Sequence, residues 1–228
     1  MAARCKVKIS VVIPALNEAD SIEETLLLLQ AWRHRGHEVI VADGGSCDET
    51  KALAGPLADV VVDTAKGRAR QMNHGARKAR GDVLLFLHAD TRLPEKTPQL
   101  IRTAILRKPW GRFDVRLSGK HTMLRVVEFM MNQRSHLTGI ATGDQAIFVT
   151  RTLFEKINGF ADIPLMEDID LSKRLKAFSK PACIHHKLVT SSRRWEQHGI
   201  FRTILLMWRL RLAYFFGIGP ERLAKIYQ

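Results

Sequence analysis

Four short apolar runs, separated by stretches of helical periodicity, dominate the first half of the chain. They occupy residues 8–14, 38–42, 59–63 and 83–87 and are rich in Val, Ile and Leu. Runs of this length and composition predict buried β-strands. Helices are expected between them at 20–32, 48–54 and 67–80, with Asp20 or Ser21 as the cap of the first. The alternation predicts an α/β fold: a mostly parallel, Rossmann-type sheet with flanking helices.

Polar side chains follow three of these strands at the point where each strand ends. Asn17 and Glu18 follow the first strand, Asp43 follows the second, and His88 and Asp90 follow the fourth. The carboxyl ends of parallel strands meet at one edge of a sheet, and open α/β sheets bind their ligands there. We therefore expect these side chains to line one crevice.

The rest of the chain has a less regular pattern. Helices are expected at 98–108, 121–135, 151–157, 167–178 and, at the end of the chain, 201–216. Strands are expected at 112–117, towards the end of 142–149, and at 186–192. The run at 112–117, RFDVRL, alternates in the way typical of an exposed or edge strand.

The 228-residue chain carries a formal net charge of +13, most of it in the C-terminal half. Such a charge attracts nucleic acid, acidic lipid or phosphorylated substrates. Nucleic acid is not expected, because aromatic residues make up 7% of the chain and none lies in the basic run at 68–80. Cys5, Cys47 and Cys183 form no CxxC pair, and the N-terminal sequence does not resemble a signal peptide. A reducing, cytoplasmic location is the simplest interpretation.

Five segments resemble, in order and spacing, those of family 2 glycosyltransferases with the GT-A fold. They are IPALNE at 13–18, ADGGSCDET at 42–50, GRARQMNHGARKARGDVLLFLHADT at 67–91, GDQAIF at 143–148 and MEDIDLSKRL at 166–175. Within that family the chain is most similar to the small radical-SAM/selenodomain-associated branch. The resemblance implies a GT-A-like domain at 1–198, with a nucleotide-binding half at 1–92 and an acceptor half at 93–198. A basic, apolar helical segment follows at 199–228.

The resemblance assigns the first three segments to the donor nucleotide. Asp43 takes the place of the acidic residue that contacts the base, and Gly44 allows the backbone to approach closely. The structural alternatives are an ordinary Asp-Gly turn and helix capping by Asn17. The nucleotide-binding residues implied are Pro14, Ala15, Asn17, Glu18, Asp43, Gly44, Arg68, Arg70, Gln71, Asn73 and Ala89.

His88, Ala89 and Asp90 stand where the resembling family carries a DxD motif. The two carboxylates of that motif hold a divalent cation against the diphosphate. An imidazole in place of the first carboxylate suits Mn²⁺ better than Mg²⁺. Two roles stay open for His88: metal ligand, or hydrogen-bond partner of Asp90. The expected cofactor is Mn²⁺ or Mg²⁺, with Asp90, His88 and His198 as candidate ligands, and whether the metal is required stays open.

Glu167 and Asp168 resemble the ED pair that lies beside the acceptor in this family. An inverting transfer needs a base for the proton of the acceptor hydroxyl, and the resemblance implies Asp168, with Glu167 as the alternate. Both carboxylates could instead complement the dipole of the helix that they open. The sugar and acceptor residues implied are Gly143, Asp144, Arg194 and Trp195, although the full QxxRW string of processive members is absent.

The C-terminal segment at 201–216 is apolar on most sides but is interrupted by Arg202, Arg209 and Arg211. It is therefore a poor membrane-spanning helix. Two alternatives stay open: an interfacial helix on an anionic membrane, or a helix packed across the catalytic domain.

Together these features predict an inverting glycosyltransferase that uses a UDP- or GDP-linked sugar. The acceptor is undefined, and a lipid or another membrane-associated molecule is one candidate. Peripheral contact with the inner face of the membrane is left open. The alternatives are a nucleotidyltransferase-like enzyme using a nucleoside triphosphate, and a non-catalytic relative that binds a nucleotide sugar or nucleic acid.

Overall fold

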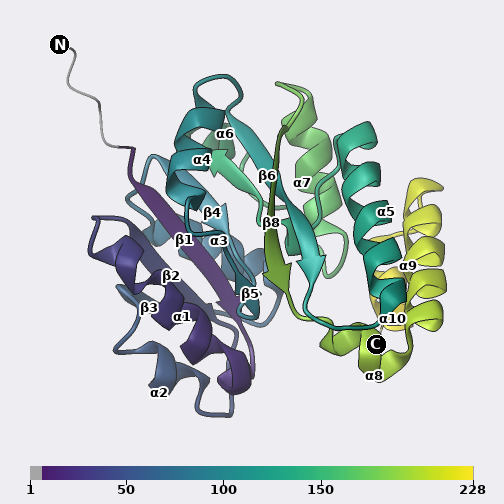
Figure 1. Ribbon diagram of the computed structural model, residues 1–228, viewed down its shortest axis with the longest axis horizontal. Coiled ribbons are helices and arrows are strands. Elements are labelled where there is room, and N and C mark those ends of the chain that lie inside the picture. Colours follow the sequence, from purple (N-terminus) through teal and green to yellow (C-terminus); the bar gives the residue numbers. More distant parts are fainter. Residues whose placement is uncertain (1–6, 228) are drawn as a thin grey trace.

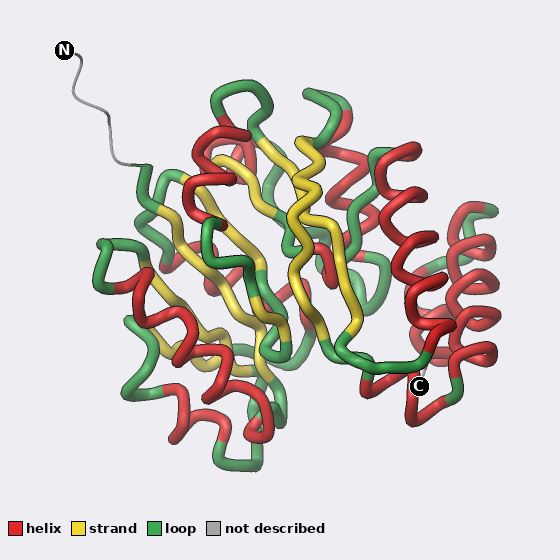
Figure 2. Tube along the Cα trace, viewed as in Figure 1, coloured by secondary structure: helices red, strands yellow, loops and turns green. Residues whose placement is uncertain are grey.

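An eight-stranded sheet runs through the computed structural model, which describes residues 7–227 (Figure 1). The strand order is β3-β2-β1-β4-β7-β6-β8-β5. Helices flank the sheet on both faces and continue beyond it at the C-terminal end of the chain (Figure 2). The predicted α/β fold class is confirmed. Cys5 and the first six residues of the expected 1–198 domain lie outside the described residues, as does residue 228.

The first half of the sheet is parallel. β1 (Ile9–Ala15) pairs with β2 (Glu38–Asp43) and β4 (Val83–Phe86), and β2 also pairs with β3 (Val60–Asp63). The connecting helices are α1 (Ala19–Arg33), α2 (Thr50–Ala54) and α3 (Arg68–Lys78). These elements confirm the predicted ones to within two residues at each end. The predicted cap of α1 is wrong, because the helix follows Glu18, and Asp20 and Ser21 lie inside its first turn.

The second half of the sheet is mixed. β7 (Phe148–Thr150) runs antiparallel to β4 and β6 (Trp110–Leu117), β6 is parallel to β8 (Ala182–Thr190), and β5 (Thr91–Arg92) is antiparallel to β8. The helices of this half are α4 (Thr97–Ile105), α5 (Thr122–Thr138), the 3₁₀ turn η1 (Gly143–Gln145), α6 (Arg151–Lys156) and α7 (Glu167–Lys176).

The prediction that residues 112–117 form an exposed or edge strand is wrong. β6 lies between β7 and β8, and Arg112 is fully buried. The Arg112 guanidinium forms an ion pair with Asp114, whose other carboxylate oxygen lies 3.0 Å from Nδ1 of His185. Two of the three polar positions that suggested exposure, Arg112 and Asp114, are therefore paired with each other, which offsets the cost of burying an isolated charge, whereas Arg116 is exposed as expected.

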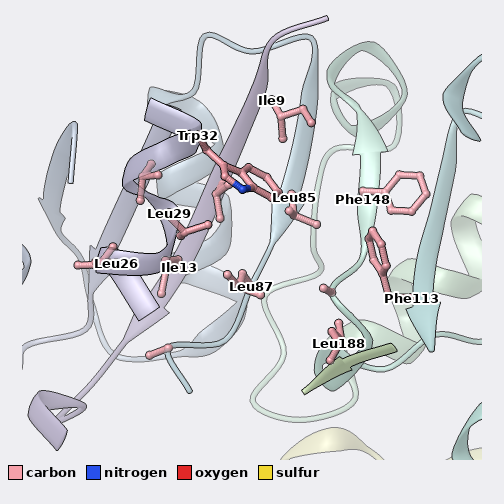
Figure 3. Packing of buried hydrophobic residues seen from close by; sticks show 14 of the residues in the cluster. Ile9, Ile13, Leu26, Leu29, Trp32, Leu85, Leu87, Phe113, Phe148 and Leu188 are labelled. Atoms are coloured by element: carbon pink, nitrogen blue, oxygen red, sulfur yellow. The ribbon is translucent and has the colours of Figure 1, made fainter. Parts of the chain in front are cut away.

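Side-chain alternation along β1 divides the core into two layers. Ile9 and Ile13 face a cluster that includes Leu26 and Trp32 of α1, together with residues of α4 and α5 (Figure 3). Val12 faces the opposite cluster, to which α3, α6 and α7 contribute. Because both faces of the sheet are covered, the first strands are continuous apolar runs rather than alternating ones. A ligand can therefore reach the sheet only at the ends of its strands.

Three helices end the chain: α8 (Arg193–His198), α9 (Ile200–Phe215) and α10 (Pro220–Tyr227). The helix predicted at 201–216 is confirmed as α9, but it is not the last, because a turn at 216–219 leads into α10. Leu210 of α9 and Leu223 of α10 pack against Met166 and Ile169 at the start of α7. Among residues 7–227, no helix combines the length and apolar character needed to cross a bilayer.

Candidate active site

A cavity of about 330 Å³ opens at the carboxyl ends of β1, β4, β6 and β8. Its other walls come from η1, from the start of α7 and from the three C-terminal helices. The cavity gathers most of the site residues that the sequence suggests: Pro14, Glu18, Arg68, His88, Ala89, Asp90, Gly143, Asp144, Glu167, Asp168, Arg194 and Trp195. The remaining predicted residues do not line it: Ala15, Asn17, Asp43, Gly44, Arg70, Gln71, Asn73 and His198.

Asp43 is buried at the end of β2 and organises the turn that follows. Its Oδ2 accepts hydrogen bonds from the N–H groups of Gly45 and Ser46, both at 2.9 Å, and its Oδ1 accepts from the Ser46 hydroxyl. Asn17 has a left-handed backbone (φ 54°), and its Oδ1 accepts from the N–H of Cys47 at 2.9 Å. The Asp-Gly turn is thus present, and Asn17 ties it to the loop after β1 instead of capping α1.

The side chain of Gln71 in α3 is buried beneath this turn. Its Nε2 donates to the carbonyl oxygens of Ala15 (2.6 Å) and Ala42 (3.0 Å), and so joins the ends of β1 and β2. A Cβ added at Gly44 would lie 2.9 Å from the same nitrogen, so the glycine makes room for the amide. The Gln71 side chain therefore supports the turn from below in this structure.

Two other predicted residues of α3 hold the loop after α6. Asn73 exchanges two hydrogen bonds with the backbone of Phe160, at 2.8 and 2.9 Å. The Arg70 guanidinium forms an exposed ion pair with Asp162 at 2.8 Å. Both side chains thereby fix a neighbouring loop and lie outside the cavity lining.

Glu167 and Asp168 begin α7 at the cavity wall. Burial raises the pKa of Glu167 from 4.5 to about 7; the charge of Asp168 adds to the rise, and Arg68, 3.8 Å from Oε1, opposes it. Asp168 accepts from the N–H of Gly143 at 2.8 Å and from the N–H of Ile169 at 2.7 Å, one on each oxygen. The pair presents a carboxyl that exchanges its proton near neutral pH beside a carboxylate fixed by backbone donors.

His88 lies against η1. Its Nδ1 is 3.4 Å from Oδ1 of Asp144, and a Cβ added at Gly143 would lie 2.6 Å from its Nε2. Nε2 is buried and has no hydrogen-bond partner within the described part of the chain. Burial, and next the charge of Arg68, lower the pKa of His88. The imidazole is therefore neutral at pH 7, the form that can ligate a metal.

The imidazole and carboxylate groups at this cavity are of the kinds that bind divalent cations, but they do not form a complete set of metal ligands. Within residues 7–227, no three His, Cys, Asp or Glu side chains are grouped so as to hold a metal ion. His198 is exposed at the end of α8 and does not line the cavity, so it does not join His88 and Asp90 as the predicted third ligand. A carboxylate beside a neutral imidazole suits Mn²⁺ better than Mg²⁺, if a bound diphosphate supplies further oxygen ligands.

The cavity is also lined by residues that the sequence did not suggest, and two of them, Arg193 and Tyr227, contact predicted site residues. Arg193 places Nη2 3.6 Å from Oε2 of Glu18, a carboxyl whose pKa is raised by burial. The ring of Tyr227 lies 3.8 Å from the guanidinium of Arg194. Arg193 adjoins a predicted residue and could have been included. Tyr227 reaches the cavity only because α10 folds back after α9, and no local pattern indicates that.

Comparisons with known proteins agree with this architecture. Residues 10–148 match the family model described as glycosyl transferase family 2. The chain is 30% identical over 229 residues to an uncharacterized glycosyltransferase of Mycobacterium tuberculosis, an alignment that covers 92% of this chain and 86% of the relative.

Two solved structures share the fold at lower identity. A mannosyltransferase from Pyrobaculum calidifontis, in complex with GDP-Man and Mn²⁺, matches with a TM-score of 0.67 and 21% identity over 92% of this chain and 62% of its own. A fragment of Staphylococcus aureus TarS, in complex with UDP-GlcNAc, matches with a TM-score of 0.66 and 16% identity over 81% of this chain and 58% of its own. The chain thus spans less than two thirds of either structure. By its family match and its fold, the chain belongs to glycosyltransferase family 2 and has the GT-A architecture.

Proposed function

We propose that the chain transfers a sugar from a UDP- or GDP-linked donor to an acceptor hydroxyl, with inversion at the anomeric carbon. The observation that carries this proposal is the cavity, which is lined by a carboxylate pair on α7, the His88–Asp90 segment and four arginines of the described chain, Arg68 and Arg194 among them. Arginines suit the diphosphate, and the carboxylates suit the acceptor. The nucleotide sugars in the two structural neighbours, UDP-GlcNAc and GDP-Man, support a donor of this class.

On the donor side, Arg68 and Arg194 are the proposed contacts of the diphosphate. The base and ribose would lie over the loops after β1 and β2, against the segment from Pro14 to Glu18 and the turn at Asp43. Because Gln71, Asn73 and Arg70 bond to protein partners, the proposed role of the first is to hold the ends of β1 and β2, and that of the other two is to hold the loop after α6.

On the acceptor side, Asp168 is the proposed base, with Glu167 as the alternate. The acceptor oxygen forms a bond to the anomeric carbon while the bond from that carbon to the diphosphate oxygen breaks. The hydroxyl proton passes to the carboxylate. Each oxygen of Asp168 accepts one backbone hydrogen bond and keeps a lone pair for this proton. Gly143, Asp144 and Trp195 are proposed to contact the sugar or the acceptor.

Asp90 and His88 would hold a divalent cation, Mn²⁺ in preference to Mg²⁺. Such an ion neutralises the charge that builds on the leaving diphosphate. The Mn²⁺ in the Pyrobaculum mannosyltransferase supports this choice. The proposed catalytic domain spans 1–198, with halves at 1–92 and 93–198, and a basic, apolar C-terminal segment at 199–228 contributes to the cavity wall. The proposed location is cytoplasmic, and the proposed acceptor is a lipid or another membrane-associated molecule. Placement in the radical-SAM/selenodomain-associated branch remains a prediction from sequence resemblance.

The test is a thermal-shift panel of UDP, GDP, CDP and their sugar conjugates, with ATP and CTP as triphosphates, each with Mn²⁺, Mg²⁺ or EDTA. A ligand at 100 times its dissociation constant stabilises the folded state by about 2.7 kcal/mol. One diphosphate sugar should raise Tm, and the rise should vanish in EDTA. A rise that survives EDTA would move the neutralising role to the arginines. A rise with a triphosphate alone would overturn the proposal in favour of nucleotidyl transfer.

A further inference from the structure

Five large apolar side chains form an exposed stripe along α9. Their spacing of four, three, four and three residues places them on one helix face, and each is between 59% and 77% exposed: Phe201, Leu205, Trp208, Leu212 and Phe215. The opposite face of α9, with Thr203 and Leu210, is buried. A helix on a protein surface rarely has large apolar side chains on both faces. The outer stripe therefore indicates a surface that binds another molecule.

Two arginines border this stripe. At 100° per residue, Arg202 and Arg209 fall together on one flank, whereas Arg211 lines the cavity, and α9 contains no Asp or Glu. Arg202 and Arg209 form no ion pair or side-chain hydrogen bond with any residue between 7 and 227. An apolar stripe bordered by unpaired arginines matches a bilayer surface, where the apolar side chains enter the acyl region and the guanidinium groups reach lipid phosphates.

Helix α5 extends the apolar surface. It contacts α9 and runs beside it (Figure 1). Its buried side, with Leu124 and Met131, packs on the sheet, and its outer side exposes Val126, Phe129 and Met130, each at least half exposed.

We propose that the outer face of α9, together with α5, docks on an anionic lipid bilayer. The inner face of α9 contributes Thr203, Met207, Leu210 and Arg211 to the cavity wall. One helix then separates the bilayer from the site, and the acceptor enters the cavity from the membrane. This last step rests on the proposed transferase function, whereas the docking surface does not.

A second copy of the chain is a poorer occupant of the same face. Pairing two copies through α9 would bring Arg202 and Arg209 of each chain together without an acid on either helix, and each chain carries +13 overall. Like charges at an interface oppose association. An anionic bilayer supplies the complementary charge over the same surface.

The experiment is flotation of the full chain with vesicles of phosphatidylcholine alone or in an equimolar mixture with phosphatidylglycerol, at low and high salt. Wild type should float with the mixed vesicles at low salt and lose most of its binding at high salt. The variant Leu205→Glu/Leu212→Glu should lose about 100-fold or more in partitioning. The control Leu27→Glu/Leu106→Glu changes two leucines that are at least half exposed, in α1 and after α4, well away from α9 (Figure 1), and should bind like wild type.

The outcomes separate docking from catalysis, because nucleotide binding is measured on the same proteins without vesicles. Both double variants should keep the thermal shift with the diphosphate sugar, since none of the four leucines lines the cavity. Equal loss of flotation in both variants, or wild type that stays unbound, would overturn the docking surface. So would light scattering that shows a wild-type dimer dissociated by Leu205→Glu/Leu212→Glu. Flotation without any nucleotide shift would leave the docking surface standing and refute the proposed function instead.

Discussion

Replacing Glu167 with Gln should stabilise the protein, and more so as the pH rises. The folded state raises the pKa of this buried carboxyl from 4.5 to about 7, chiefly by desolvation. Between these values the folded chain holds a proton that the unfolded chain releases, so wild-type stability falls as pH increases. Glutamine has nearly the same shape and no charge to desolvate. The variant therefore avoids the free-energy cost of burying a charged carboxyl. In wild type this cost is absent well below pH 4.5 and complete above pH 7.

The size of the effect follows from the two pKa values. At about 1.4 kcal/mol for each pH unit between them, the full penalty is about 3 kcal/mol. The variant should exceed wild type by about 1 kcal/mol at pH 5 and about 3 kcal/mol at pH 8. For a chain of this length the latter corresponds to a rise in Tm of about 6–12 °C.

The assay is urea denaturation of both proteins at pH 5 and pH 8, followed by circular dichroism and tryptophan fluorescence. Titrating groups that do not interact with Glu167 are shared, so they cancel in the difference between the two proteins. Coincident transitions by both probes would justify the two-state treatment. An equal difference at both pH values, or a variant less stable than wild type at pH 8, would refute the argument that the cavity desolvates this carboxyl.

Three further predictions concern the cavity and its support. Asp168→Asn should lower kcat by about 10²–10⁴-fold while nucleotide binding, followed by thermal shift, persists. Arg68→Gln removes the positive charge that opposes the rise in the pKa of Glu167, so this pKa should climb above its present value. In the denaturation series, the pH at which the free energy of unfolding levels off should therefore move upward. Gly75→Ala would place a Cβ 2.5 Å from Cγ1 of Val12 in the centre of the sheet, and the free energy of unfolding should fall by about 2 kcal/mol in urea titrations.

β1, β2 and β4 could be predicted because each is buried on both faces, which leaves an uninterrupted apolar run in the sequence. The edge strand β3 could be predicted because its three valines form a run of the same kind. The position of β6 could not. Arg112 and Asp114 alternate with apolar residues as they would at an edge, and only their pairing inside the protein makes a central strand possible. The local sequence pattern shows whether a residue is polar, but it does not show which distant residue pairs with it.

The same limit applies to the amides of α3. Gln71 and Asn73 lie in a segment that resembles a nucleotide-binding helix, and a free amide there would be a reasonable ligand contact. The structure pairs both with distant backbone groups, Gln71 at the ends of β1 and β2 and Asn73 in the loop after α6. Tyr227 is the reverse case: nothing in its neighbourhood of the sequence suggests a site, yet the turn before α10 brings it to the cavity. Both outcomes depend on contacts across the fold.

The cavity is built to accommodate an imidazole at position 88. A ring needs more room than the carboxylate expected there, and Gly143 provides it, because any Cβ would lie 2.6 Å from Nε2. The neighbouring Asp144 lies 3.4 Å from the other ring nitrogen. The charges of Asp144 and Asp90 both act on the imidazole, so the negative charge that a DxD motif concentrates at one strand end is divided here between η1 and the segment after β4. A requirement for a cation at this site should consequently depend on Asp144 as well as on Asp90.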